Sequence, residues 1–311
     1  MNQAWKALPI CLSLVFLGSC KSSPEQVADS QPVIFALTVS NIERSMNWYE
    51  DHLDFSRDTV MNFPGYGVTV GMMHQGEFYL EFVHFEHGLS PKSLEFPKGA
   101  TALNGFFKIG FLSTDIERLY NKLSNSSSVK VIAPLESLKP VRGISWPEQH
   151  FLLADPDGNY VQFFSPPVGS AAPSISISPF LIASSSQDLD ASIHWYEQNL
   201  EAQLIDRVGQ PGNERAILNK DGLMIELGSF QGYVPLDSLN TPDDTPLSQI
   251  HGIRKLTFLV PYIYKPYDRM LQNQIPFDYD LTEQKSMVGD RYFMISDDVG
   301  NAIQFFDRDK K

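Results

Sequence analysis

The chain has 311 residues, of which 42% are hydrophobic, and this is enough for two globular cores. It carries 24 basic and 37 acidic residues, which gives a formal net charge of −13. Because a protein that binds phosphates needs a basic face, this balance argues against a nucleic-acid partner and favours a solvated acidic surface.

Residues 1–20 have the pattern of a secretion signal. Lys6 precedes an apolar run over residues 8–16, which is too short to span a bilayer as a helix, and Leu17-Gly18-Ser19-Cys20 follows. This ending resembles the lipobox of bacterial lipoproteins, and the resemblance implies cleavage before Cys20 and acylation of that residue. We therefore expect a protein of the bacterial cell envelope, lipid-anchored to a membrane and facing the periplasm, with residues 21–31 as a polar tether. An uncleaved anchor or a chance match is the alternative.

This processing would leave no free cysteine thiol in the mature protein. Cys11 would be removed with the signal, and Cys20 would carry lipid. The mature chain would then offer no thiol for a nucleophile, a disulfide or a cysteine-based metal site.

The rest of the chain is duplicated. Residues 41–49 return as residues 188–196, shifted by 147 positions, and the turn 155–159 returns as 297–301 after a change of loop length. We expect two similar domains over 32–166 and 178–309. The segment 167–177, rich in Pro, Ser, Gly and Ala, is the expected linker.

Each copy contains two units of the same order. Residues 33–39 alternate as a strand does, Ser40-x-x-Glu43 has the form of a capping box, and an apolar helical stripe follows. A second strand over 106–112 leads into a second capping box at Thr114-x-x-Glu117, and hairpin strands flank the turn 155–159. Four strand–helix–three-strand units are expected, at about 32–90, 103–166, 178–230 and 251–308.

The segments 41–49 and 151–159, with their second copies, resemble the vicinal oxygen chelate superfamily, which includes glyoxalase I, bleomycin- and fosfomycin-resistance proteins and extradiol dioxygenases. The resemblance covers nearly all of the chain after residue 31. It implies an α+β fold in which four βαβββ modules pair into two glyoxalase-like domains with cup-shaped mixed sheets. In the family, the first and last strands of two paired modules hold one metal. The fold hosts many reactions, so the resemblance identifies the fold better than the chemistry.

The four metal positions of the family carry the same residue types in both copies. In the first copy they fall on Ile34, Glu81, Lys108 and Gln162, and in the second on Leu181, Glu226, Lys255 and Gln304. The polar residues have apolar sequence neighbours, which would point to the opposite face of each strand and leave the polar side chains in the cup.

This set does not suit a divalent metal, which normally takes three His or carboxylate ligands. We therefore expect no metal and no cofactor. We expect instead an ion pair in each cup, Glu81 with Lys108 and Glu226 with Lys255. Three alternatives remain open: the pair is structural, it also receives a polar ligand, or the lysine is catalytic.

Three other side chains are candidates for the cups. Trp146 and His150 precede the hairpin of the first copy, and His251 lies four residues before Lys255 on the same strand face. Packing of an aromatic side chain is the alternative for Trp146 and His150, and the other histidines show no ligand spacing.

Three functional classes follow. We favour a membrane-anchored lipoprotein that binds a small organic molecule without metal. The alternatives are a metal-dependent lyase, isomerase or dioxygenase of the same superfamily, and a structural or protein-interaction module.

Overall fold

The computed structural model describes residues 33–141, 144–167, 177–239, 247–283 and 291–308. Cys20, the expected signal and tether, and linker residues 168–176 lie outside this part of the chain. Within the described residues, no helix is both long and apolar enough to cross a membrane.

The four expected βαβββ modules are confirmed. The first has β1 (Val33–Thr38), α1 (Ile42–Leu53), β2 (Ser56–Phe63), β3 (Val68–Gln75) and β4 (Phe78–Phe85); the second has β6 (Gly105–Ser113), α2 (Ile116–Ser124), β7 (Lys130–Ser137), β8 (Gln149–Ala154) and β9 (Tyr160–Phe164). The third has β10 (Ile177–Ser185), α3 (Leu189–Leu200), β11 (Gln203–Gln210), β12 (Asn213–Lys220) and β13 (Leu223–Phe230); the fourth has β15 (Gly252–Val260), α4 (Tyr264–Gln272), β16 (Phe277–Glu283), β17 (Arg291–Ser296) and β18 (Ala302–Asp307). Short strands β5 (Ala102–Leu103) and β14 (Tyr233–Val234) pair with each other.

The helices begin one residue later than the capping boxes predicted. Asn41 and Asp115 cap α1 and α2, each accepting a hydrogen bond from the backbone N–H three residues on. Asn and Asp are caps as good as Ser and Thr, so sequence alone does not decide between adjacent candidates. The hydroxyl of Ser40 instead accepts a hydrogen bond from Arg44 at 2.6 Å.

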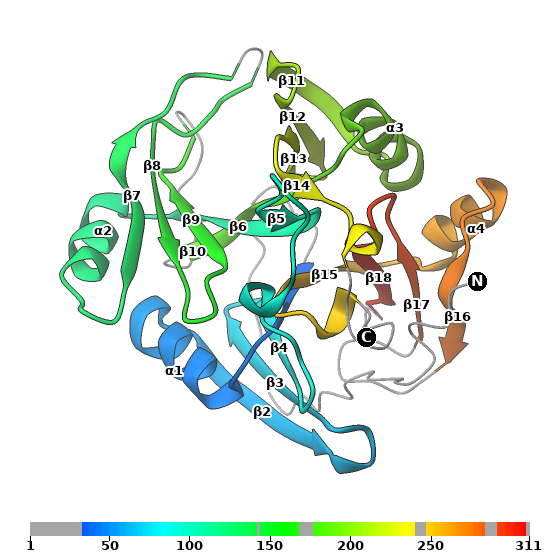
Figure 1. The fold of residues 1–311 in the computed structure, drawn as a ribbon, viewed down its shortest axis with the longest axis horizontal. Coiled ribbons are helices and arrows are strands. Elements are labelled where there is room, and N and C mark those ends of the chain that lie inside the picture. The colour runs from blue at the N-terminus through cyan, green and yellow to red at the C-terminus, as the bar shows by residue number, and fades with distance from the viewer. Residues whose placement is uncertain (1–32, 142–143, 168–176, 240–246, 284–290, 309–311) are drawn as a thin grey trace, which may run out of the picture.

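The two large sheets do not follow the two sequence copies. One has the order β16-β17-β18-β15-β1-β4-β3-β2, and the other β11-β12-β13-β10-β6-β9-β8-β7. The first module therefore shares a sheet with the fourth, and the second with the third (Figure 1). We call these the outer-module sheet and the inner-module sheet, and each has antiparallel pairing at its centre, β1 with β15 and β10 with β6.

One hydrophobic core lies between the two sheets and their helices. It includes Phe35 and Phe78 of the outer-module sheet and Phe111 of the inner-module sheet. The ring of Phe111 lies 5.5 Å from that of Phe78 and 6.3 Å from that of Phe35, both edge-on. The opposite face of each sheet carries a separate, smaller apolar cluster, and these two faces are the cups.

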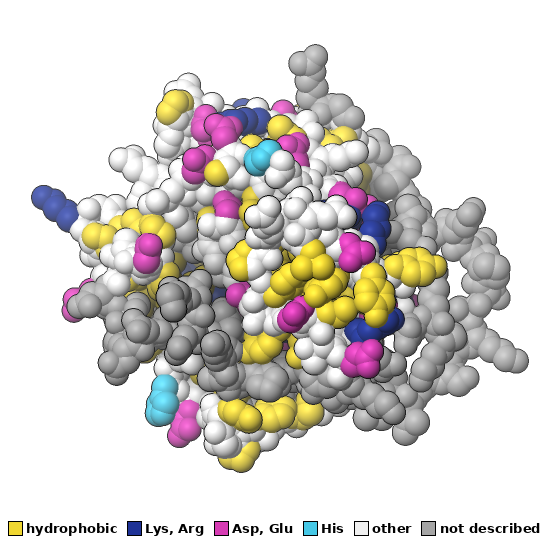
Figure 2. Space-filling model, turned by 90° about the vertical axis from the view of Figure 1, so that its right-hand side faces the viewer, with side chains coloured by type: hydrophobic (Ala, Val, Ile, Leu, Met, Phe, Trp, Pro, Cys, Tyr) yellow, Lys and Arg dark blue, Asp and Glu magenta, His cyan; other side chains and the backbone are white. Residues whose placement is uncertain are grey.

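The surface in Figure 2, on the side that carries α4 and β16, mixes acidic, basic and apolar side chains. Basic side chains form no continuous patch on the part of this face that the structure describes.

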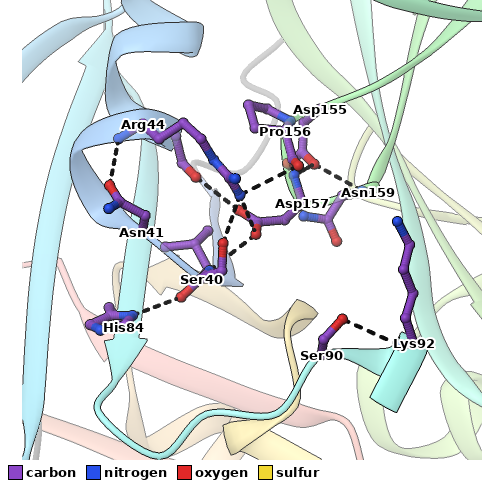
Figure 3. Close-up of polar contacts among 12 residues, drawn as sticks. Ser40, Asn41, Arg44, His84, Ser90, Lys92, Asp155, Pro156, Asp157 and Asn159 are labelled. Carbon is purple, nitrogen blue, oxygen red and sulfur yellow. Dashed lines mark hydrogen bonds and ion pairs between the residues drawn. The ribbon is translucent and has the colours of Figure 1, made fainter. Parts of the chain in front are cut away.

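A turn of the inner-module sheet joins it to helix α1 of the outer-module sheet. Asp157, between β8 and β9, accepts hydrogen bonds from the backbone N–H of Ser40 at 3.1 Å and from the hydroxyl of Ser45 at 2.9 Å, and pairs with Arg44 at 2.9 Å (Figure 3). Its neighbour Asp155 is buried and accepts from the Tyr49 hydroxyl at 3.3 Å. The turn is thus clamped against the start of α1.

The second copy makes the reciprocal contact. Tyr196 of α3 donates to Asp297 at 2.7 Å, and Ser192 donates to Asp298. Asn301 adds a bond to the inner-module sheet, accepting from the backbone N–H of Phe106 at 2.8 Å. Gly105 permits this approach, since it has φ +120° and a Cβ there would lie 2.8 Å from the Asn301 oxygen. Two sets of hydrogen bonds therefore join the two sheets, one from each turn.

These buried aspartates should make stability depend on pH. Burial, the largest cause in both cases, raises the pKa of Asp155 to about 6 and that of Asp297 to about 7. A carboxyl whose folded pKa is raised contributes stability that is complete below its unfolded pKa, near 3.9, and is lost as pH rises through the folded value. We expect the advantage of wild type over Asp297→Asn to shrink between about pH 4 and pH 7, by at most about 1.4 kcal/mol per pH unit.

Urea unfolding of both proteins across this range is the measurement. Asp155→Asn should show the same trend ending near pH 6, and Asp51→Asn, on the exposed face of α1, is the control. A difference between wild type and Asp297→Asn that does not change with pH would contradict the buried, protonated carboxyl.

Candidate functional site

Strand alternation brings the expected polar residues to the cup faces. Gln162 lies between Val161 and Phe163, and Glu226 between Ile225 and Leu227, and these four neighbours belong to the central core. The polar side chains therefore face the other way.

A β-bulge lies next to Lys108 in β6. The register of β10 with β6 shifts between Ala183 and Ser184, which leaves Phe107 as an extra residue. Phe107 was expected on the core face, but it packs with the cup cluster, and its ring centre lies 5.9 Å from the Lys108 ammonium. An equivalent shift in the β1–β15 pairing leaves Arg254 as the extra residue.

Each cup holds a buried lysine–glutamate ion pair, but with partners other than those predicted. Lys108 Nζ lies 2.6 Å from Glu226 Oε2, and Lys255 Nζ lies 2.8 Å from Glu81 Oε2. The predicted pairs, Glu81–Lys108 and Glu226–Lys255, are wrong because each cup is built from modules of different sequence copies. Side-chain exposures of 7–14% show that both pairs are largely removed from water.

The inner-module pair has a further cation. Burial acts to raise the pKa of Glu226, but Lys108 and then Arg215 outweigh it, so this pKa is lowered overall. Arg215 lies 3.7 Å from the second carboxylate oxygen, with its side chain 55% exposed at the edge of the cup. Both oxygens of Glu226 therefore have cationic partners.

Neither donor set fits the metal of the family. At the metal positions of the family, each cup offers one carboxylate already paired with an ammonium, and one amide, where a divalent ion needs about three anionic or imidazole ligands. Within the described residues, no group of three or more His, Cys, Asp or Glu side chains is placed to hold a metal.

The outer-module cup is mainly apolar. Its polar residues besides the ion pair include Thr257, whose hydroxyl donates to Gln304 Oε1 at 3.1 Å. Its buried apolar side chains are Ile34, Val68, Val70, Met72, Tyr79, Leu259, Tyr292 and Phe306.

His251 lies at the loop before β15. Its backbone N–H donates to Leu89 O at 2.8 Å, and its pKa is lowered first by burial. The charged groups that act on it include Asp157 and His84, and the two cup glutamates are not among them.

Three polar side chains of the inner-module cup contact one another in a row. His150 Nε2 lies 3.2 Å from Glu136 Oε1, and His150 Nδ1 lies 2.7 Å from Gln162 Nε2. Burial is the largest cause of a lowered pKa at His150, which favours the neutral ring. Gln162 Oε1 is buried and has no hydrogen-bond partner among the described residues.

Aromatic rings lie beside these three polar side chains. The Trp146 ring lies 5.5 Å from that of Phe180, which lies 5.0 Å from that of Phe164, and Phe164 stacks on His150 at 6.2 Å. Trp146 and His150 thus lie on the same cup face as Lys108 and Gln162, but here they meet the third module as well as the second.

Glu136 and Arg215 were not among the residues expected in the cups. The hairpin alternation could have found Arg215, because it lies two residues before Ile217, which pairs with Glu226 in register. Glu136 is harder to find, because the register of β7 with β8 shifts twice.

Double-mutant cycles should distinguish the observed pairs from those predicted. Removing one partner leaves an uncompensated buried charge, at a cost on the order of 3 kcal/mol, whereas removing both costs much less. We expect Lys108→Met and Glu226→Gln to couple by at least about 1 kcal/mol in the free energy of unfolding.

The control cycle combines Lys108→Met with Glu81→Gln, which lie in different sheets, and should be additive within about 0.5 kcal/mol. Strong coupling in the control and none in the first cycle would contradict the cross-copy sheets.

A family model described as the Glyoxalase/Bleomycin resistance protein/Dioxygenase superfamily matches residues 31–163 and 181–305. Among solved structures, glyoxalase I from Zea mays is similar at 15% identity and a TM-score of 0.63, over 89% of this chain and 92% of that one. A putative dioxygenase from Bacillus subtilis subsp. subtilis str. 168 is similar at 10% identity and a TM-score of 0.61, over 90% of this chain and 86% of that one. No curated protein matches the sequence significantly.

At these identities the solved structures support the fold alone, and they agree with the four modules and two mixed sheets described above. The family model covers both copies and more than half of the residues. The chain therefore belongs to the Glyoxalase/Bleomycin resistance protein/Dioxygenase superfamily.

Proposed function

We propose that the protein binds a small organic molecule in the inner-module cup, without a catalytic metal. The observation that carries this proposal is the Lys108–Glu226 contact of 2.6 Å, which places an ammonium where the family has a metal ligand. The cup also keeps an acceptor, Gln162 Oε1, that has no hydrogen-bond partner in the described part of the chain and lies beside aromatic rings. Apolar walls with a few convergent polar groups are typical of small-molecule sites.

Binding suits this cup better than catalysis. A general base or nucleophile needs a lone pair that can reach the substrate. Lys108 donates to Glu226, both oxygens of Glu226 have cationic partners, and both ring nitrogens of His150 have contacts. The alternative of a metal-dependent lyase, isomerase or dioxygenase would require a different donor set.

We also propose that the protein is located in the cell envelope. The Leu17 to Cys20 pattern supports a lipoprotein anchored to a membrane of the cell envelope through Cys20, facing the periplasm. Its partners would then be a small organic molecule and the lipid bilayer, with no nucleic acid.

Native mass spectrometry and elemental analysis of protein purified without chelator test the binding proposal. We expect a co-purifying organic molecule that raises the melting temperature when it is added back, and metal well below one equivalent per chain. In Lys108→Met with Glu226→Gln, which removes the pair while limiting the stability cost, binding of the molecule should weaken, because the polar centre of the cup is lost. One equivalent of Zn, Fe, Mn or Ni that disappears in Glu226→Ala would support the enzyme alternative, and neither ligand nor metal would support a structural module.

Cys20→Ala tests the location. Loss of acylation should move the protein from the membrane fraction to the soluble or secreted fraction. An unmodified N-terminal peptide in wild type, together with a variant that stays in the membrane, would contradict the lipoprotein proposal.

A further inference from the structure

The amide of Gln162 has a defined orientation. An ionised carboxylate has acceptors and no donor. The contact of Glu136 with His150 Nε2 at 3.2 Å therefore places the imidazole proton on that nitrogen. The Nδ1 of the neutral ring is then an acceptor, and Gln162 must approach it with its NH₂ group, at 2.7 Å. The Gln162 oxygen is the end left without a partner among the described residues.

The other cup shows what this oxygen lacks. Its counterpart, Gln304 Oε1, accepts from the hydroxyl of Thr257, the residue paired with it in register. In the inner-module sheet the residue paired with Gln162 is Gly110, which has no hydroxyl. A Cβ on Gly110 would lie 2.8 Å from the Phe164 ring and 3.0 Å from Leu181, so the ring of Phe164 takes the space of the missing side chain.

A buried carbonyl oxygen without a donor is unfavourable, and a ligand that supplies the donor removes that penalty. The charges near it are balanced, because Lys108 and Arg215 are matched by Glu226 and Glu136. Balanced charges give a charged ligand no net attraction. The half-buried ring of Trp146, packed on the buried rings of Phe180 and Phe164, offers a flat apolar contact.

We infer that the inner-module cup takes an uncharged, planar, largely apolar molecule that donates one hydrogen bond, from a hydroxyl or N–H group, to Gln162 Oε1. The inference rests on the proposed function, since it names the ligand class of that same cup. His150 is a positioning residue here, because it acts on the ligand only through the amide that it orients.

Two probes test this, one with a hydroxyl donor and one in which a methyl group replaces the hydroxyl hydrogen. The full chain carrying Cys20→Ala, which removes the expected acylation, is titrated with para-fluorophenol and with para-fluoroanisole, and binding is followed by fluorine NMR. We expect the phenol to bind about tenfold tighter, the effect of one net hydrogen bond. In Gln162→Met the affinity for the phenol should fall to that for the anisole. Gln304→Met, the matched change in the outer-module cup, should keep the preference.

A pH titration tests whether His150 orients the amide of Gln162 or only packs against it. When His150 gains a second proton, Nδ1 becomes a donor and the amide oxygen must turn toward it. The charged groups that act on His150 are Glu136 on β7, Lys108 on β6 and Glu226 on β13. The preference for the phenol should therefore disappear on acidification, with the affinity for the anisole unchanged.

Equal binding of the two probes at neutral pH would overturn the inference and leave small-molecule binding intact. A preference that survives Gln162→Met would also overturn it. Failure of both probes to bind saturably would also overturn the inference, whereas the proposed function fails only if no organic molecule co-purifies with the protein.

Discussion

The antiparallel pairing at the centre of each sheet decides what the cups contain. Because β1 pairs with β15 and β10 with β6, a glutamate from one sequence copy meets a lysine from the other. Two parallel pairings then extend each sheet outward, β1 with β4 and β15 with β18 in one and β10 with β13 and β6 with β9 in the other. Without these central ladders, each buried charge would be left without its partner.

The same arrangement explains why the clamps between turns and helices are reciprocal. Each sequence copy has one module in each sheet. The turn 155–159, in the inner-module sheet, therefore contacts α1 of the outer-module sheet across the core, and the turn 297–301, in the outer-module sheet, contacts α3 of the inner-module sheet. Both contacts use a tyrosine hydroxyl and a buried aspartate. The first also reaches the backbone N–H of Ser40 through Asp157, and the second reaches that of Phe106 through Asn301. The two copies thus became unequal while keeping one plan.

Much of the fold could be predicted from the repeat itself. The shift of 147 positions and the alternation of strands identified the four modules, and the resemblance to the superfamily implied the polar positions of the cups. The pairing of modules could not be predicted, because both copies carry Glu, Lys and Gln at equivalent positions, and every pairing then gives the same chemistry. The predicted start of α1 was one residue too early, because Ser40 and Asn41 are both good N-cap residues. The placement of Phe107 was wrong because a bulge interrupts the alternation on which it was based.

The difference between the cups lies in a few positions. Thr257 and Gly110 occupy equivalent places, as do Val70 and Arg215, and so one cup satisfies its glutamine internally while the other leaves an acceptor beside a charged rim. We propose that in both cups a lysine ammonium takes the position of the metal. Crystals grown with excess nickel, with anomalous diffraction recorded at the nickel edge, distinguish the two occupants. No anomalous peak should appear in either cup, and Lys108 should remain in contact with Glu226; a peak bonded to Glu226 and Gln162, with Lys108 turned away, would show a metal site instead.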